Sequence, residues 1–140
     1  KLAEKFGGFV SVELHTDLSH DFDAILSYGK RFHAICPDHF IVKVPLTPTG
    51  ILGARALKEA GVKINFTLEF SARQNVLISR VTKPDFVNVF LGRINAYISD
   101  NSLGDGNMAG EKATLSSQRA VQQSRDEKGV STRQIAASTP

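Results

Sequence analysis

The sequence is poor in cysteine, methionine and tryptophan, and it has no long hydrophobic run. Its single cysteine, Cys36, cannot form a disulfide within the chain, so we expect a protein of a reducing compartment and assign it to the cytoplasm. A transmembrane helix needs about 20 consecutive apolar residues, and no stretch of this sequence approaches that length. These absences argue against a disulfide-rich secreted domain and against a membrane partner.

A large excess of charge of one sign is also absent. Lysine and arginine total 17 against 14 aspartates and glutamates, which gives a formal net charge of +3 at pH 7. Basic residues neither cluster in a run nor alternate with aromatic ones, so we expect no nucleic-acid partner. The small positive excess suits small anionic substrates. With 140 residues, of which 41% are hydrophobic and 22% charged, the chain is expected to form one domain over residues 1–140.

A GxGxxG motif is missing after the first predicted strand, which argues against a dinucleotide-binding Rossmann domain. The sequence instead alternates apolar strands with amphipathic helices. The predicted strands cover residues 9–14, 40–44, 62–68, 86–91 and 132–137. The predicted helices cover residues 21–35, 48–60, 72–81 and 112–128, and a polar loop is predicted over about 99–110. This alternation is typical of an α/β fold with a parallel sheet, either doubly wound or part of a (β/α)₈ barrel, which so few strands cannot close.

The strand predicted at residues 40–44 contains one cation, Lys43, among apolar residues. Burial disfavours the charged form of an amine, and a neutral amine can attack a carbonyl to form a Schiff base. The alternative is a lysine whose stem is covered by protein and whose ammonium reaches water. The sequence around Lys43 leaves both interpretations open.

Further polar residues lie within the predicted strands or just after them. They are Glu13, Asn65, Thr67, Asn88, Arg93 and Ser138. In a parallel α/β sheet the carboxyl ends of the strands form one rim, and ligands bind there. We therefore expect these side chains to converge with Lys43 on one pocket.

This set of residues suits imine chemistry on a phosphorylated sugar. Dehydration of a carbinolamine needs a proton donor, and Glu13 could serve directly or through a water held by Thr67. Asn65 could bind a substrate hydroxyl, and Arg93 suits a phosphate. Simpler roles stay open. Glu13 could pair with Lys43 as a structural ion pair, Asn65 and Thr67 could cap a turn, and Arg93 could face solvent.

Five short blocks of the sequence resemble, in order, the motifs of the transaldolase family. They are Val-Glu at 12–13, Val-Lys-Val-Pro-Leu-Thr at 42–47, Ile-Asn-Phe-Thr-Leu-Glu-Phe-Ser at 64–71, Phe-Leu-Gly-Arg-Ile at 90–94 and Ala-Ala-Ser at 136–138. The family fold is a (β/α)₈ barrel, and on that template the chain corresponds roughly to the third to the seventh strand. The first two strands of the template, one of which carries a catalytic aspartate, and its eighth strand have no counterpart here. We therefore expect the chain to be part of a longer protein, and to lack a complete site by itself.

The resemblance implies a Schiff-base transaldolase of the pentose phosphate pathway, which moves a dihydroxyacetone unit from a ketose phosphate to an aldose phosphate. Lys43 matches the imine-forming lysine, Glu13 the acid–base carboxylate, and Thr67 the residue that positions the catalytic water. The substrate-binding matches are Asn65 for the dihydroxyacetone unit, Asn88 beside it, Arg93 for the phosphate and Ser138 at the phosphate end. Sugar phosphates are the expected partners and no cofactor is expected, while the sequence does not decide whether the protein forms a homo-oligomer.

Two positions depart from the family pattern. Asn88 stands where the family often has serine, which bears on the ligand contacts. Thr139 and Pro140 follow Ser138, whereas a second phosphate-binding arginine or lysine usually follows that serine. This second departure bears on phosphate affinity and on the shape of the pocket.

Two alternative functions involve the same pocket. Fructose-6-phosphate aldolases resemble the family but release dihydroxyacetone, and they typically carry glutamine near the position of Glu13 and tyrosine near that of Phe90. The residues present here therefore favour the transferase. The second alternative is a sugar-phosphate-binding protein without turnover, against which the presence of Lys43 with Glu13 argues.

One polar turn offers residues that could in principle hold a metal ion. It contains His15, Asp17, His20 and Asp21. Their spacing is not a recognised ligand pattern, so we expect no metal and interpret the turn as a solvated loop at the rim of the pocket.

Overall fold

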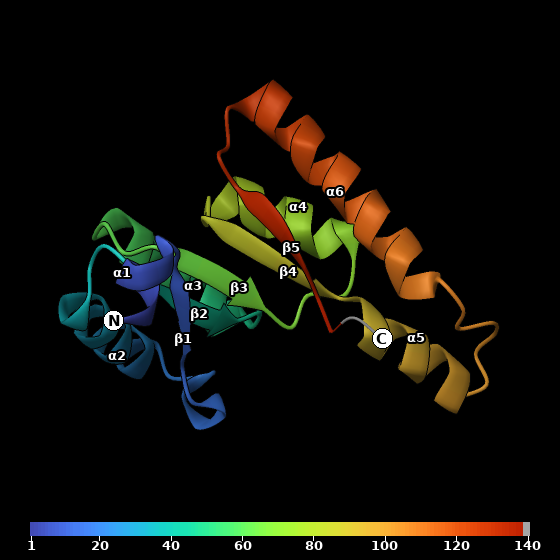
Figure 1. The fold of residues 1–140 in the computed structure, drawn as a ribbon, viewed down its shortest axis with the longest axis horizontal. Helices are drawn as coiled ribbons and strands as arrows, with labels where there is room; N and C mark the ends of the chain where they lie inside the picture. The colour runs from blue at the N-terminus through green and yellow to red at the C-terminus, as the bar shows by residue number, and fades with distance from the viewer. Residues whose placement is uncertain (139–140) are drawn as a thin grey trace.

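The computed structural model describes residues 1–138, in which five parallel strands form one sheet (Figure 1). The strands are β1 (Val10–Glu13), β2 (Phe40–Pro45), β3 (Ile64–Thr67), β4 (Phe86–Phe90) and β5 (Arg133–Ala137). The helices are α1 (Leu2–Phe6), α2 (Phe22–Ile35), α3 (Pro48–Glu59), α4 (Ala72–Val81), α5 (Leu91–Asp100) and α6 (Ala109–Lys128), with a 3₁₀ turn η1 (Thr16–Leu18) before α2. Within the described chain, no helix is both long and apolar enough to cross a membrane.

Strands that are neighbours in the sheet are also neighbours along the chain. The order is β1-β2-β3-β4-β5, and each neighbouring pair is parallel. A doubly wound sheet reverses its strand order at a switch point, whereas the strands of a (β/α)₈ barrel follow one another around the axis. The observed order therefore selects the (β/α)₈ type of α/β architecture, and the fold class predicted from the sequence is confirmed.

The sheet buries one face against helices. Alternate residues of the central strands are fully buried there: Val42 and Val44, Ile64 and Phe66, Val87 and Val89. The helices contribute Ile25 from α2, Leu57 from α3, Ile78 from α4 and Val121 from α6 to the same core. In Figure 1, α3 and α4 lie behind the strands. Because side chains alternate across a strand, the residues between the buried ones point to the opposite face, which we call the polar face after Glu13, Lys43, Asn65 and Asn88.

The helices on the buried face begin where the sequence supplies a capping side chain. Asp21, Thr47 and Ser71 precede α2, α3 and α4, and each accepts a hydrogen bond from the backbone N–H three residues later. Such caps satisfy donors that the first turn of a helix leaves free. Pro48 occupies the first position of α3, where its fixed φ suits the helix and its missing N–H costs nothing. The observed bounds of these helices agree with the predicted ones to within a residue.

The sequence did not predict α5, and it placed the start of α6 too late. α5 begins at Leu91 directly after β4, and its N-cap Phe90 makes no side-chain capping hydrogen bond. The start of α6 is capped from a distance, because the Gly110 N–H donates to the Asn95 Oδ1 at 2.6 Å and Glu111 accepts from the Asn95 Nδ2 at 3.0 Å. The loop predicted at 99–110 is therefore shorter than expected. A cap that comes from the preceding helix leaves no local signal in the sequence.

Candidate active site

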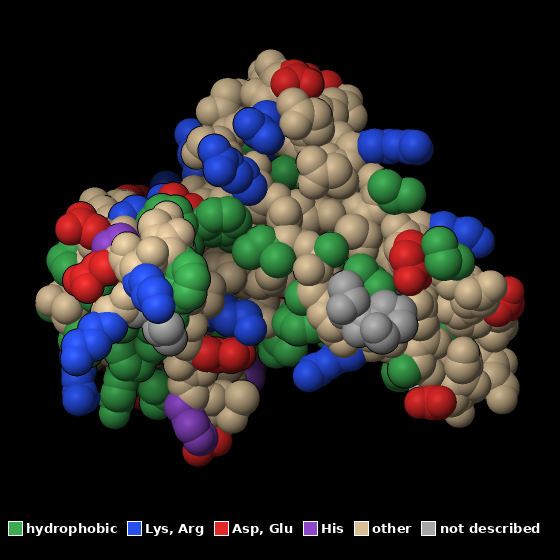
Figure 2. All heavy atoms as spheres, in the orientation of Figure 1, with side chains coloured by type: hydrophobic (Ala, Val, Ile, Leu, Met, Phe, Trp, Pro, Cys, Tyr) green, Lys and Arg blue, Asp and Glu red, His purple; other side chains and the backbone are tan. Residues whose placement is uncertain are grey.

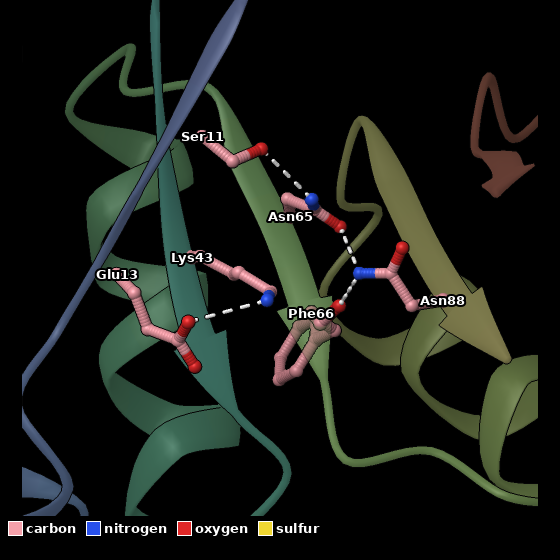
Figure 3. Close-up of polar contacts among 6 residues, drawn as sticks. All are labelled: Ser11, Glu13, Lys43, Asn65, Phe66 and Asn88. Carbon is pink, nitrogen blue, oxygen red and sulfur yellow. Dashed lines mark hydrogen bonds and ion pairs between the residues drawn. The ribbon is translucent and has the colours of Figure 1, made fainter. Parts of the chain in front are cut away.

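Lys43 and Glu13 meet on the polar face of the sheet. Glu13 of β1 is in register with Lys43 of β2, so both side chains leave the sheet on the same side. The Lys43 Nζ lies 3.2 Å from the Glu13 Oε2 (Figure 3). The side chain of Lys43 is 20% exposed and that of Glu13 is 55% exposed. The lysine is thus mostly covered by protein, and its amine meets a carboxylate instead of reaching water alone.

This contact fits two interpretations that the sequence left open. An amine and a carboxylate at this distance form an ion pair, but partly exposed pairs contribute only about 0–1 kcal/mol to stability. The same geometry brings the two groups within the range of about 2.6–3.2 Å that proton transfer requires. Because the structural benefit of such a pair is small, its position at the carboxyl ends of the strands favours a chemical role.

The ring of Phe90, at the end of β4, lies close to two cations. Its centroid is 5.7 Å from the Lys43 Nζ and 5.2 Å from the Arg93 Cζ. The ring of Phe70 tilts against it, with the two centroids 6.2 Å apart. Cations are attracted to the face of an aromatic ring. The Phe90 ring therefore interacts both with the amine of Lys43 on β2 and with the guanidinium of Arg93 at the start of α5. Figure 2 shows this side of the molecule, where hydrophobic side chains lie among acidic and basic ones.

Two buried asparagines extend the polar face from β1 to β4. The Asn88 Nδ2 donates to the Asn65 Oδ1 at 2.8 Å and to the Phe66 carbonyl at 2.6 Å. The Asn65 Nδ2 in turn donates to the Ser11 Oγ at 3.0 Å, as Figure 3 shows. Asn65 is also in register with Lys43. The network therefore orients the Asn65 amide on the same face of the sheet as Lys43.

Thr67 follows Asn65 by two residues on β3 and is buried. Side chains two residues apart lie on the same face of a strand, so the hydroxyl of Thr67 belongs to the polar face. Its strand position is in register with Pro45, two residues beyond Lys43. Thr67 therefore stands nearer to the carboxyl ends of the strands than the amine does.

A backbone contact joins the start of α5 to the end of β5, at the edge of the sheet opposite β1. Arg93 lies in the first turn of α5 and is exposed, and Ser138 follows β5 with a positive φ of 54°. Between them, the Gly92 N–H donates to the Ser138 carbonyl at 2.7 Å. A Cβ on Gly92 would overlap that carbonyl oxygen, so only glycine allows this approach. Thr139 and Pro140, which depart from the family pattern, lie outside the residues that the structure describes.

Sequence reasoning missed Glu69, which the structure buries completely. Its Oε1 accepts a hydrogen bond from the Asn88 backbone N–H at 3.2 Å, and its Oε2 has no hydrogen-bond partner among residues 1–138. Burial raises the pKa of the Glu69 carboxyl to about 8, although the Asn88 N–H and the charge of Lys43 act in the opposite direction. The carboxyl is therefore mostly protonated at pH 7. The sequence signal for Glu69 was the presence of an acidic residue between Leu68 and Phe70, in an otherwise apolar stretch.

A hollow of about 470 Å³ opens beside Glu13. Its walls are Glu13, His15, Asp17, Leu18, Tyr28 and Phe32. His15 and Asp17 are strongly exposed and lie 3.4 Å apart, while Asp21 caps α2. Throughout residues 1–138, no group of three or more His, Cys, Asp or Glu side chains could hold a metal ion. The polar turn therefore forms a rim next to Glu13.

Comparisons with known proteins place the chain in one family. A family model described as transaldolase/fructose-6-phosphate aldolase matches residues 1–140. A probable transaldolase of Thermus thermophilus is 36% identical over 94 residues, which is 67% of this chain and 40% of the relative. One of Nitrosopumilus maritimus is 35% identical over 88 residues, 63% of this chain and 37% of the relative. A transaldolase of Xanthomonas euvesicatoria is 34% identical over 103 residues, 69% of this chain and 32% of the relative. The chain thus spans about two fifths of the length of these relatives, or less.

Proposed function

Because the chain belongs to the transaldolase/fructose-6-phosphate aldolase family, we propose that its gene product is a transaldolase that works through a Schiff base on Lys43. The enzyme transfers a dihydroxyacetone unit from a ketose phosphate to an aldose phosphate. The observation that carries this proposal is the 3.2 Å contact between the Lys43 Nζ and the Glu13 Oε2 on the polar face. The names of the relatives, which read transaldolase or probable transaldolase, support it.

The ion pair itself supplies both groups that the first step needs. Transfer of one proton from the Lys43 ammonium to Glu13 yields a neutral amine and a carboxylic acid. The amine attacks the ketose carbonyl to form a carbinolamine. Glu13 then returns its proton to the carbinolamine hydroxyl, which leaves as water, and the C=N bond of the imine forms.

Cleavage uses the imine as an electron sink. Glu13, now ionised, accepts the proton of the substrate hydroxyl next to the scissile bond, directly or through a water held by Thr67. That carbon–carbon bond breaks, the aldose phosphate leaves, and the electron pair passes to the protonated imine. The three-carbon unit stays on Lys43 until an aldose phosphate acceptor takes it by the reverse steps.

The remaining residues bind the sugar phosphate. Asn65 holds a hydroxyl of the dihydroxyacetone unit, and its hydrogen bonds to Ser11 and Asn88 support this role because they orient its amide. Arg93 and Ser138 bind the phosphate group. Their support is the contact between Gly92 and Ser138, which brings the start of α5 to the end of β5, together with the affinity of a guanidinium for phosphate.

The proposal extends to the whole protein. Residues 1–140 form part of a (β/α)₈ barrel domain of a longer protein, which acts on sugar phosphates of the pentose phosphate pathway in the cytoplasm. The chain covers 40% of the Thermus thermophilus relative, which supports this assignment. Activity is therefore measured on the complete gene product.

Reductive trapping tests the Schiff base. The gene product is incubated with fructose 6-phosphate and borohydride, and the modified peptide is identified by mass spectrometry. We expect a reduced dihydroxyacetone adduct on Lys43. We expect none with Lys43→Arg, because the guanidinium of arginine stays protonated and is not a nucleophile. A well-folded protein that binds the sugar phosphate without any adduct would instead be a binding protein without turnover.

A further inference from the structure

Side-chain hydrogen bonds supplement the backbone pairing between β3 and β4. Among the described residues these two strands share one register pair, Asn65 with Phe86, whereas β2 and β3 share four. The Phe66 carbonyl accepts from the side chain of Asn88, and the Asn88 backbone N–H donates to the Glu69 Oε1. The carboxyl of Glu69, two residues after β3, thus binds a backbone N–H of β4.

The hydrogen bond from the Asn88 backbone N–H to Glu69 orients Asn88. With its backbone N–H held by Glu69, Asn88 directs its amide across to β3, where it reaches the Asn65 Oδ1 at 2.8 Å. Asn65 continues the chain of contacts to Ser11 on β1. Removal of Glu69 would leave a buried N–H unpaired, which is costly inside a protein. The orientation of Asn65 therefore depends on Glu69 through Asn88.

Burial favours the neutral form of Glu69, whereas the backbone N–H groups of Asn88 and of Glu69 itself and the charge of Lys43 favour the ionised form. Lys43 on β2 is the charged group whose field acts on Glu69, and Lys43 already pairs with Glu13 on β1. The facing residue of β4, Asn88, is uncharged, and Arg93 on α5 is exposed and lies against Phe90. An ionised Glu69 would have to reach water or compete with Glu13 for Lys43. Burial accordingly raises the pKa of Glu69 to about 8.

We propose that protonated Glu69 is a positioning residue, which holds Asn88 and through it orients Asn65 for the dihydroxyacetone unit. The inference rests on the proposed function, because that function assigns Asn65 to the substrate. Ionisation of Glu69 weakens this positioning, because a buried carboxylate is costly and is drawn toward water or toward Lys43, away from the Asn88 N–H. The site is therefore well ordered only below the pH at which Glu69 ionises.

Steady-state kinetics of the gene product between pH 6.5 and 9.5 test this role. In the wild type we expect KM for the ketose phosphate to rise about tenfold above pH 8, with a smaller change in kcat, as for a lost hydrogen bond. Glu69→Gln keeps an uncharged acceptor of the same shape, so its KM should stay level over the whole range. Glu69→Leu should show a high KM at every pH. An alkaline rise that persists unchanged in Glu69→Gln would overturn the proposal.

A spectroscopic titration needs neither turnover nor a folded variant. In the wild type labelled with ¹³C at glutamate carboxyls, we expect one carboxyl to titrate near the value of about 8 set by burial, and the Asn88 amide resonance to follow it. A Glu69 carboxyl that titrates near 4.5, or an Asn88 amide that does not respond, would refute the role of Glu69. Failure of borohydride trapping on Lys43 would refute the imine mechanism instead, so the two failures can be told apart.

Discussion

At the scale of single residues, the site contains two carboxyl groups in opposite surroundings. Glu13 is 55% exposed and meets an amine, whereas Glu69 is fully buried and meets a backbone N–H. A carboxyl that pairs with an amine can exchange protons with it during a reaction. A buried neutral carboxyl can instead act as a fixed hydrogen-bonding group. Substitution of each by glutamine should therefore give different results.

Glu13→Gln should remove the acid–base group and leave the fold intact. We expect kcat of the gene product to fall by about 10²- to 10⁴-fold, which is the usual contribution of general acid–base catalysis. Borohydride trapping on Lys43 should become slower but remain detectable. Glu59→Gln is the matched control, because Glu59 is an exposed glutamate of α3 that pairs with Arg55, and it should leave kcat unchanged. Full activity in Glu13→Gln would exclude Glu13 as the proton donor.

Glu69→Gln should change how stability depends on pH. The pKa of Glu69 is raised from 4.5 to about 8 on folding, so between these values the folded state holds a proton that the unfolded state has lost. The contribution of Glu69 to stability is thus complete below pH 4.5 and is lost as the pH rises toward 8. Relative to the wild type, the variant should gain stability over this window, on the order of 4 kcal/mol by pH 8. Urea unfolding at pH 4.5, 6 and 8 measures the difference, and a difference that does not vary with pH would contradict the prediction.

The sequence allows a role to be predicted for Glu13 but not for Glu69. Glu13 could be found because it ends a strand one βα unit before Lys43, and the ends of parallel strands meet at one rim. Asn65 and Thr67 could be found in the same way. Glu69 could not be assigned a role, because its partner is the backbone N–H of Asn88 on the next strand.

At the scale of elements, the sequence predicts the start of a helix when the residue just before it supplies a capping side chain. It misses or misplaces a helix start that has no such local cap. α4 was predicted at its observed bounds, Ala72–Val81, because Ser71 caps it and an apolar face follows. α5 starts without a capping side chain, and α6 is capped by Asn95 from α5. The strands were predicted to within about two residues. The missed helix α5 matters for the site because Arg93, expected at a strand end, lies in its first turn.

Gly92→Ala should disturb only the phosphate-binding end of the proposed site. The new Cβ would meet the Ser138 carbonyl oxygen and push the start of α5, with Arg93, away from the end of β5. We expect KM for a ketose phosphate to rise about tenfold, which corresponds to roughly 1.4 kcal/mol of lost binding. KM for the unphosphorylated ketose should change much less. Gly8→Ala is a suitable control because a Cβ there would meet no atom within 4 Å. An equal rise for both sugars would show that Gly92 affects the fold rather than the phosphate.

At the scale of the whole molecule, the candidate site extends across the entire sheet. Glu13 lies on β1, Lys43 on β2, Asn65 on β3 and Asn88 on β4, and Ser138 follows β5. The first four strands thus contribute to the same face, because the strands keep the order of the chain and run parallel. The alternation of strands and helices in the sequence was enough to predict this arrangement. The choice of the barrel type over a doubly wound sheet needed the family resemblance or the observed strand order.

Under the proposed imine mechanism, the groups around Lys43 decide the fate of the three-carbon unit. Release of free dihydroxyacetone requires a proton on the carbon of the enamine and then hydrolysis of the imine. On the polar face, Glu13 lies beside the Lys43 nitrogen, while the Phe90 ring, with its centroid 5.7 Å from the same nitrogen, carries no proton donor. A positioned acid contributes about 10²- to 10⁴-fold to such a step, so release should be slow by a comparable factor. Transfer to an aldehyde needs no such proton on carbon.

We therefore expect the gene product to depend on an acceptor. With fructose 6-phosphate and an aldose phosphate, a new ketose phosphate should form at the full rate. With fructose 6-phosphate alone, one glyceraldehyde 3-phosphate per active site should appear in a burst, followed by release of dihydroxyacetone that is about 100-fold slower. Rapid-quench measurement of both products distinguishes the two activities of the family. Release of dihydroxyacetone without an acceptor at the transfer rate would make the protein a fructose-6-phosphate aldolase, because the proton that Phe90 cannot supply would have to come from elsewhere on this face.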